Sequence, residues 1–162
     1  MRFAEHSHLA YCTNIHRGEN WAETFVSLKS YTLKVRNQVC AKDEPYAIGL
    51  RLSALAASEL SELATLKTFK NWLSTNNCYV FTINGFPYGE FHNVRVKETV
   101  YRPDWQTRER LDYTKLLFDL LVELLPEGVA GSVSTVPCSF KSFIENEEQI
   151  DAMRNNLHDC VE

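Results

Sequence analysis

The chain has 162 residues, a length that suits one domain. Hydrophobic residues make up 44% of it and charged residues 23%, which are the proportions of an ordinary globular protein and argue against an intrinsically disordered chain. The net charge is −4 and the basic residues are scattered, so the sequence predicts no nucleic-acid partner.

The five cysteines are odd in number, widely spaced and without a CxxC pair, a pattern that argues against a zinc site or a disulfide framework. No apolar run reaches the ~20 residues that a membrane-spanning helix needs, and the N-terminus has no apolar signal core. We therefore expect a cytoplasmic protein with reduced cysteines and no direct membrane insertion.

Residues 9–13 (LAYCT) predict a first, short strand, which a loop over residues 14–20 follows. The next stretch has apolar residues spaced mostly for one face of a helix, and Glu19 and Glu23 lie near its N-terminus, where carboxylates are favourable. These apolar residues are Trp21, Phe25, Leu28, Leu33 and Val35. The segment reads as a βα unit.

A second unit follows the turn-prone sequence KDEP. Residues 46–52 (YAIGLRL) predict a strand, and apolar residues three or four positions apart then predict a helix that runs to about residue 75. In the third unit, residues 79–83 (YVFTI) predict a strand and residues 108–125 a long helix, which Pro126 and Gly128 end.

A fourth strand is predicted over residues 132–136 (SVSTV), and a fourth helix from residue 145 to the last residue. No cap, glycine or proline closes this helix before Glu162. We therefore expect residues 1–162 to be a single, partial domain that stops inside its fourth helix.

Alternating strands and helices of this length predict parallel strands with right-handed crossovers. An open doubly wound sheet and a (β/α)8 barrel both fit. The four units average ~40 residues each, which is close to the length of one unit in a barrel of about 250 residues or more. We therefore expect four consecutive βα units forming the N-terminal half of a (β/α)8 TIM barrel. Half a barrel has two open strand edges, which predicts either dimers through these edges or loops that shield them.

In either architecture, ligands meet the C-terminal ends of the strands. Asn14 and His16 follow the first strand and Asn84 ends the third, so the two asparagines are candidate substrate-binding residues. His16 is a candidate for proton transfer or metal binding, or it is a loop histidine that only forms hydrogen bonds. Arg51 should point opposite to its leucine neighbours. There it would meet either a structural ion-pair partner or a substrate carboxylate or phosphate.

The long loop within residues 82–105 (TINGFPYGEFHNVRVKETVYRPDW) is the other source of candidates, because long connections in compact domains usually bind or react. His92 is a candidate catalytic residue and a candidate metal ligand, and Glu98 could orient its imidazole. Glu98 is also a candidate general base, the alternative being a carboxylate that pairs with Arg95 or Arg102 to hold the loop.

Other side chains of this loop are candidates for substrate binding. Lys97 and Arg102 could hold a phosphate, and the alternative for Lys97 is a solvated loop cation. Tyr88 and Tyr101 could stack on a sugar or an aromatic metabolite, or they could fold the loop onto the barrel.

Four sequence pieces lie at the four predicted strands: YCTNIH, IGLRLS, TINGFPYGEFH followed by VKETVYRPDW, and SVSTVP. Together they resemble the EboE family of metabolite traffic proteins, which belongs to the xylose isomerase-like TIM barrels, a superfamily with sugar-phosphate isomerases and epimerases. The resemblance covers essentially the whole chain. EboE proteins are about twice this length, so it implies an N-terminal half.

The resemblance implies a protein that binds or handles a small polar metabolite in secondary-metabolite processing or export, beside partner proteins of an export system. The alternative is a metal-dependent sugar-phosphate isomerase or epimerase. In the superfamily, most ligands of the divalent metal come from later strands, so such a metal would need the C-terminal half. The residues leave open whether the full protein is an enzyme, and residues 1–162 alone are expected to be inactive.

Overall fold

The computed structural model describes residues 1–4, 7–89 and 97–162. Its main sheet has four parallel strands in the order in which they follow along the chain: β3 (Ala10–Cys12), β4 (Tyr46–Arg51), β5 (Cys78–Asn84) and β6 (Ser132–Ser134). The predicted α/β class with four parallel strands is therefore confirmed. A doubly wound sheet reverses its strand order at a switch point, and the described sheet has no such reversal.

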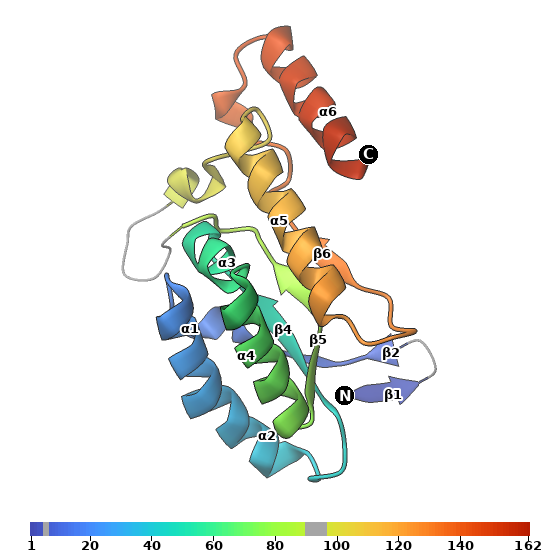
Figure 1. Cartoon of the computed structure of the whole chain (residues 1–162). Helices are drawn as coiled ribbons and strands as arrows, with labels where there is room; N and C mark the ends of the chain where they lie inside the picture. The colour runs from blue at the N-terminus through green and yellow to red at the C-terminus, as the bar shows by residue number, and fades with distance from the viewer. Residues whose placement is uncertain (5–6, 90–96) are drawn as a thin grey trace.

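Helices connect consecutive strands and lie along one side of the sheet (Figure 1). The longer ones are α1 (Trp21–Ser27), the π-helical η2 (Leu28–Thr32), α2 (Leu33–Val39), α3 (Ala54–Leu60), α4 (Leu63–Thr75), α5 (Arg108–Leu124) and α6 (Glu147–Val161). Three short 3-10 turns are η1 (Thr13–Ile15), η3 (Lys97–Tyr101) and η4 (Lys141–Phe143). Helix α1 packs on α3, α3 on α5 and α5 on α6, so the helices follow the order of the strands.

Polar side chains begin several of these helices. Asn20 accepts a hydrogen bond from the backbone N–H of Glu23, and Ser53 accepts one from that of Ala56. Asn146 and Gln149 form a reciprocal capping box at the start of α6. Each cap satisfies N–H groups that the first helical turn leaves unpaired.

The main core lies between the sheet and the helices. Strand β4 contributes Tyr46, Ile48 and Leu50, all at most 1% exposed, and they pack with apolar side chains of the neighbouring helices such as Phe69 and Leu117. Burial raises the pKa of Tyr46 to about 12. Strand β4 is hydrophobic toward the helices and has no exposed residue, as expected for an inner strand of a parallel sheet.

Strand β5 changes register against β4, since Ile48 is paired with Val80 but Gly49 with Thr82. Val80 and Ile83 both belong to the helix-side core although three positions separate them. The extra residue lets Thr82 and Asn84 lie on the opposite face, away from the helices. Simple alternation along the predicted strand does not anticipate this change.

A two-stranded antiparallel hairpin precedes the sheet and was not predicted. It consists of β1 (Arg2–Ala4) and β2 (Ser7–His8). The His8 ring packs on Tyr79 and Phe81 of β5, and its Nδ1 lies 2.8 Å from the Tyr79 hydroxyl. The hairpin therefore contacts the sheet on the face without helices, toward the N-terminal end of β5.

Several element boundaries differ from the predictions. The single helix predicted to reach residue 75 is divided into α3 and α4, because Glu62 has an extended backbone conformation between them. Strand β6 is shorter than predicted and ends at Ser134. None of the described helices is long and apolar enough to cross a membrane.

Candidate functional site

The C-terminal ends of the parallel strands carry a group of hydrogen-bonded polar side chains on the face without helices. Thr82 Oγ1 lies 2.9 Å from Ser132 Oγ, and Ser134 Oγ donates to Asn84 Oδ1 at 3.1 Å. The paired residues are register partners across β5 and β6. We call Thr82, Asn84, Ser132 and Ser134 the polar ladder. Both serines are exposed and the other two side chains are half-buried, so the ladder is open to a ligand.

Asn84, predicted to bind substrate, thus lies in the polar ladder. Its Oδ1 also accepts a hydrogen bond from the backbone N–H of Phe86 at 3.0 Å. This bond turns the chain sharply after β5, and Gly85 N–H then donates to the carbonyl of Ser134. Asn84 therefore joins the end of β5 to the end of β6.

His16 lies in an aromatic corner next to the end of β3. Its Nε2 is 2.8 Å from the Tyr11 hydroxyl, and its ring stacks on Tyr31 with centroids 5.0 Å apart. Burial lowers the pKa of His16 and raises that of Tyr11. The neutral imidazole is therefore favoured, which suits a proton acceptor, while its Nε2 is already hydrogen-bonded to Tyr11.

Arg51 is buried, with only 2% of its side chain exposed, and the protein surrounds its guanidinium. Nη1 donates to the Gly18 carbonyl at 2.6 Å and lies 3.2 Å from Glu19 Oε1, while Nη2 donates to the Gly89 carbonyl at 2.8 Å. The sequence left two alternatives for Arg51, a structural ion-pair partner or an anionic group of a substrate. The structure contains the first, because Glu19 is an ion-pair partner. Arg51 joins the loop after β3 to the loop after β5.

Arg110 is a second buried arginine that the sequence reasoning missed. It is 0% exposed and donates to the carbonyls of Pro103, Gly85 and Phe86, at 2.8, 2.7 and 3.1 Å. Burial lowers its pKa. Its position on the buried stripe of α5, three residues before Tyr113 and seven before Leu117, is a sequence signal that could have identified it.

The other residues predicted within the long loop are dispersed. Tyr88 packs edge-on against Tyr113 at 5.0 Å, and Tyr101 against Phe86 at 5.5 Å, so both rings fasten the loop to the fold. Arg102 is exposed and lies over the Phe143 ring, 4.2 Å from its centroid.

Glu98 is exposed on η3. His92, Arg95 and the side chain of Lys97 lie outside the described residues.

Two buried oxygens near the strand ends have no hydrogen-bond partner within the described residues: Asn14 Oδ1, after β3, and Thr135 Oγ1, after β6. Buried polar atoms are normally satisfied by protein, water or ligand. These two oxygens are therefore candidate acceptors for a small polar molecule or for water, and Asn14 keeps its predicted place among the binding candidates.

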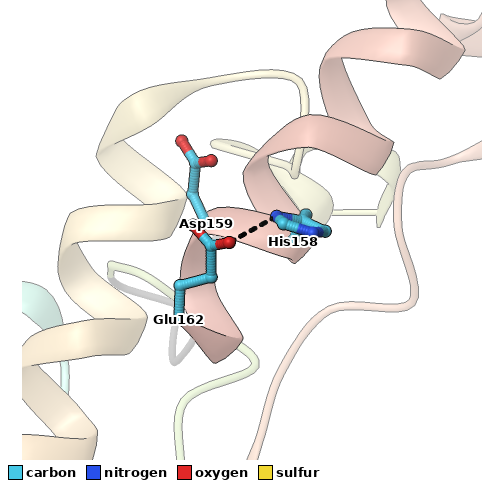
Figure 2. Close-up of side chains that lie close together, drawn as sticks. All are labelled: His158, Asp159 and Glu162. Atoms are coloured by element: carbon cyan, nitrogen blue, oxygen red, sulfur yellow. Dashed lines mark ion pairs between the residues drawn. The ribbon is translucent and has the colours of Figure 1, made fainter.

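One group of three metal-ligating side chains occurs in the described part of the chain, and it lies at the end of α6. His158, Asp159 and Glu162 lie close together there, with His158 Nδ1 3.5 Å from Glu162 Oε1 (Figure 2). The Arg108 guanidinium lies 2.5 Å from the Asp159 carboxylate and lowers its pKa. The group is solvent-facing and lies on a helix rather than on the loops that follow the strands, so it is not a component of the candidate site.

Comparisons with family models, with curated proteins and with solved structures give no match to this chain.

Proposed function

We propose that the chain is the N-terminal half of an EboE-like, xylose isomerase-like barrel and that it binds a small polar metabolite at the C-terminal ends of its strands. The polar ladder is the observation that carries this proposal. It presents hydroxyl and amide groups on the face that would line the interior of a barrel. Asn14 Oδ1 and Thr135 Oγ1, for which the described residues supply no hydrogen-bond partner, add two hydrogen-bonding positions near the ends of the outer strands.

The half-barrel architecture is supported by the sheet. Its strands are parallel and follow the chain order, and the helices lie on one side, which is the arrangement of consecutive units in a (β/α)8 barrel. Four of the sequence pieces that resemble the EboE family each begin within one of these strands and run past its C-terminal end: YCTNIH in β3, IGLRLS in β4, TINGFPYGEFH in β5 and SVSTVP in β6.

A binding function is favoured over the isomerase alternative because the described charged and titratable groups near the strand ends already have hydrogen-bond partners within the protein. The guanidinium groups of Arg51 and Arg110 are held by backbone carbonyls, so both arginines shape the site instead of reaching a phosphate. His16 Nε2 contacts Tyr11, and Asp104 accepts hydrogen bonds from Gln106 and Ser139. Hydrogen bonding to a neutral, hydroxylated molecule needs none of these four groups.

The proposal is tested by calorimetric titration of the chain with a panel of aldoses, ketoses and their phosphate monoesters. We expect at least one compound to bind, and Ser134→Ala to weaken that binding by about tenfold, because a lost hydrogen bond in a binding site costs about 1–1.5 kcal/mol. Ser58→Ala, exposed on α3, is the matched control and should leave the affinity unchanged. Absence of binding by every compound, or equal affinities for both variants, would contradict the proposal.

A further inference from the structure

Asn84 of the polar ladder is followed by Gly85, and this is the only Asn-Gly pair in the sequence. The backbone nitrogen that follows an asparagine can attack the side-chain amide when it reaches the carbonyl carbon Cγ. Glycine has no Cβ, so its backbone adopts the conformation that this attack needs with the least hindrance. Asn84 is therefore the asparagine of this chain that is most prone to react in this way.

The reaction replaces the amide by a carboxylate. The Gly85 nitrogen gives up its proton and forms a bond to Asn84 Cγ. The bond from Cγ to Nδ2 breaks, and the leaving group takes up a proton and departs as ammonia. Water then opens the cyclic imide at either of its carbonyl groups, which gives aspartate or an isoaspartyl linkage. The overall change consumes water and releases ammonia.

The structure holds both reacting groups in hydrogen bonds at the end of β5. Gly85 N–H donates to the Ser134 carbonyl at 2.9 Å, so the proton that must leave is engaged. Asn84 Oδ1 accepts hydrogen bonds from the Phe86 N–H at 3.0 Å and from the Ser134 hydroxyl at 3.1 Å, so the side-chain carbonyl is fixed. Ser134 therefore contacts the attacking group through its backbone and the attacked group through its side chain.

The donors to Asn84 Oδ1 also polarise its carbonyl, as an oxyanion hole does, but such donors accelerate an attack only when the nucleophile is in reach. Packing restrains that nucleophile. A Cβ on Gly85 would lie 2.3 Å from a methyl group of Leu117, and Arg110 donates to the Gly85 carbonyl at 2.7 Å. Asn84 itself is paired with both neighbouring strands. Restraint therefore outweighs polarisation while the strands stay paired.

We propose that Asn84 is a modification site that the fold keeps closed. Its amide persists while β5 and β6 are paired, and it is converted to a carboxylate when this junction opens. The polar ladder then has two chemical states, because conversion removes the two N–H donors of Asn84 and adds a negative charge at the end of β5. This inference rests on hydrogen bonds of the described residues and not on the metabolite, so it can fail or hold independently of metabolite binding.

The test is peptide mapping of the whole chain by mass spectrometry after incubation at mildly alkaline pH, which favours loss of the backbone proton. We expect conversion of Asn84 to be about tenfold or more slower in the folded chain than in guanidinium chloride, because the folded junction must first open. In the unfolded chain, Asn84 should react before every other asparagine. Equal rates in the two states, or earlier conversion of another asparagine in the unfolded chain, would overturn the proposal.

Two exposed serines of β6 provide a matched pair of variants. Ser134→Ala removes the hydroxyl that donates to Asn84, whereas Ser132→Ala removes the hydroxyl that contacts Thr82. We expect folded Ser134→Ala to convert Asn84 about threefold or more faster than folded Ser132→Ala, the ratio that corresponds to one hydrogen bond. Far-UV circular dichroism establishes that both variants are folded. An equal or slower conversion in Ser134→Ala would show that the hydroxyl does not protect the amide, and the proposal would be wrong.

Discussion

The arginine that joins two loops shows how a single residue can organise the candidate site. Arg51 is buried, and its guanidinium holds the carbonyls of Gly18 and Gly89, each in a different loop. Replacing it by methionine leaves both carbonyls and the Glu19 carboxylate without their donor. We expect Arg51→Met to reduce the free energy of unfolding by about 2–4 kcal/mol, measured by urea denaturation.

Arg154→Met is the control for this prediction. Arg154 forms an exposed ion pair with Asp151 on α6, which should contribute less than about 1 kcal/mol. A similar loss of stability in both variants would show that the buried hydrogen bonds of Arg51 have no special weight.

His16 gives a prediction about pH. Burial lowers its pKa in the folded protein below the usual value of about 6.5, so the unfolded chain binds more protons between these two values. The contribution of His16 to stability is therefore complete above pH ~6.5 and is lost as pH falls through the lowered, folded pKa.

Urea unfolding at a series of pH values should show this loss in the wild-type chain and a smaller one in His16→Gln. The interpretation is wrong if His16→Gln and the wild type have the same dependence.

At the scale of elements, the turn after β5 depends on the close approach of α5. A Cβ on Gly85 would lie 2.3 Å from a methyl group of Leu117 and 3.1 Å from the Ser134 carbonyl oxygen. We expect Gly85→Ala to destabilise the fold by about 1–3 kcal/mol through overpacking. Gly89 lies in the same loop, and no atom of the described residues lies within 4 Å of a Cβ placed there, so Gly89→Ala should change the thermal unfolding midpoint little.

The start of α6 can be tested in the same way. Asn146 caps the helix reciprocally with Gln149, and its loss should cost about 1 kcal/mol. Asn155→Ala, in the exposed interior of the same helix, should instead be neutral or slightly stabilising because alanine has the higher helix propensity. Urea unfolding of both variants measures the difference, and equal effects would contradict a role for the cap.

At the scale of the whole molecule, the prediction concerns catalysis. The described strand ends carry hydrogen-bonding side chains and buried arginines, and under the proposed resemblance most metal ligands would come from strands other than these four. We expect purified residues 1–162 to interconvert no aldose and ketose phosphates, with or without added Mn²⁺, as followed by NMR of the sugars. Turnover above that of the buffer would contradict this expectation and favour the isomerase alternative.

Local sequence patterns were sufficient for the α/β class and the four parallel strands. The apolar spacing of residues 21–35 and 108–125 predicted helices that the structure contains, and YAIGLRL predicted the central strand. These elements are specified by short-range periodicity, which can be read along the chain. The parallel order of the strands follows from their alternation with helices.

The site was predicted less well, because its geometry depends on residues far apart in sequence. The register change in β5, which directs Thr82 and Asn84 to the face without helices, arises from pairing with β4. The state of Arg51 depends on carbonyls 33 and 38 positions away.

The sequence by itself therefore determined the four strands of the main sheet, the segments that form most of the helices, and which end of the sheet carries polar residues. Only the tertiary structure decided which of these polar side chains are exposed to a ligand and which form the hydrogen bonds that hold the loops. The physical reason is that periodicity acts over a few residues, whereas hydrogen-bond partners and register are selected by packing across the whole domain.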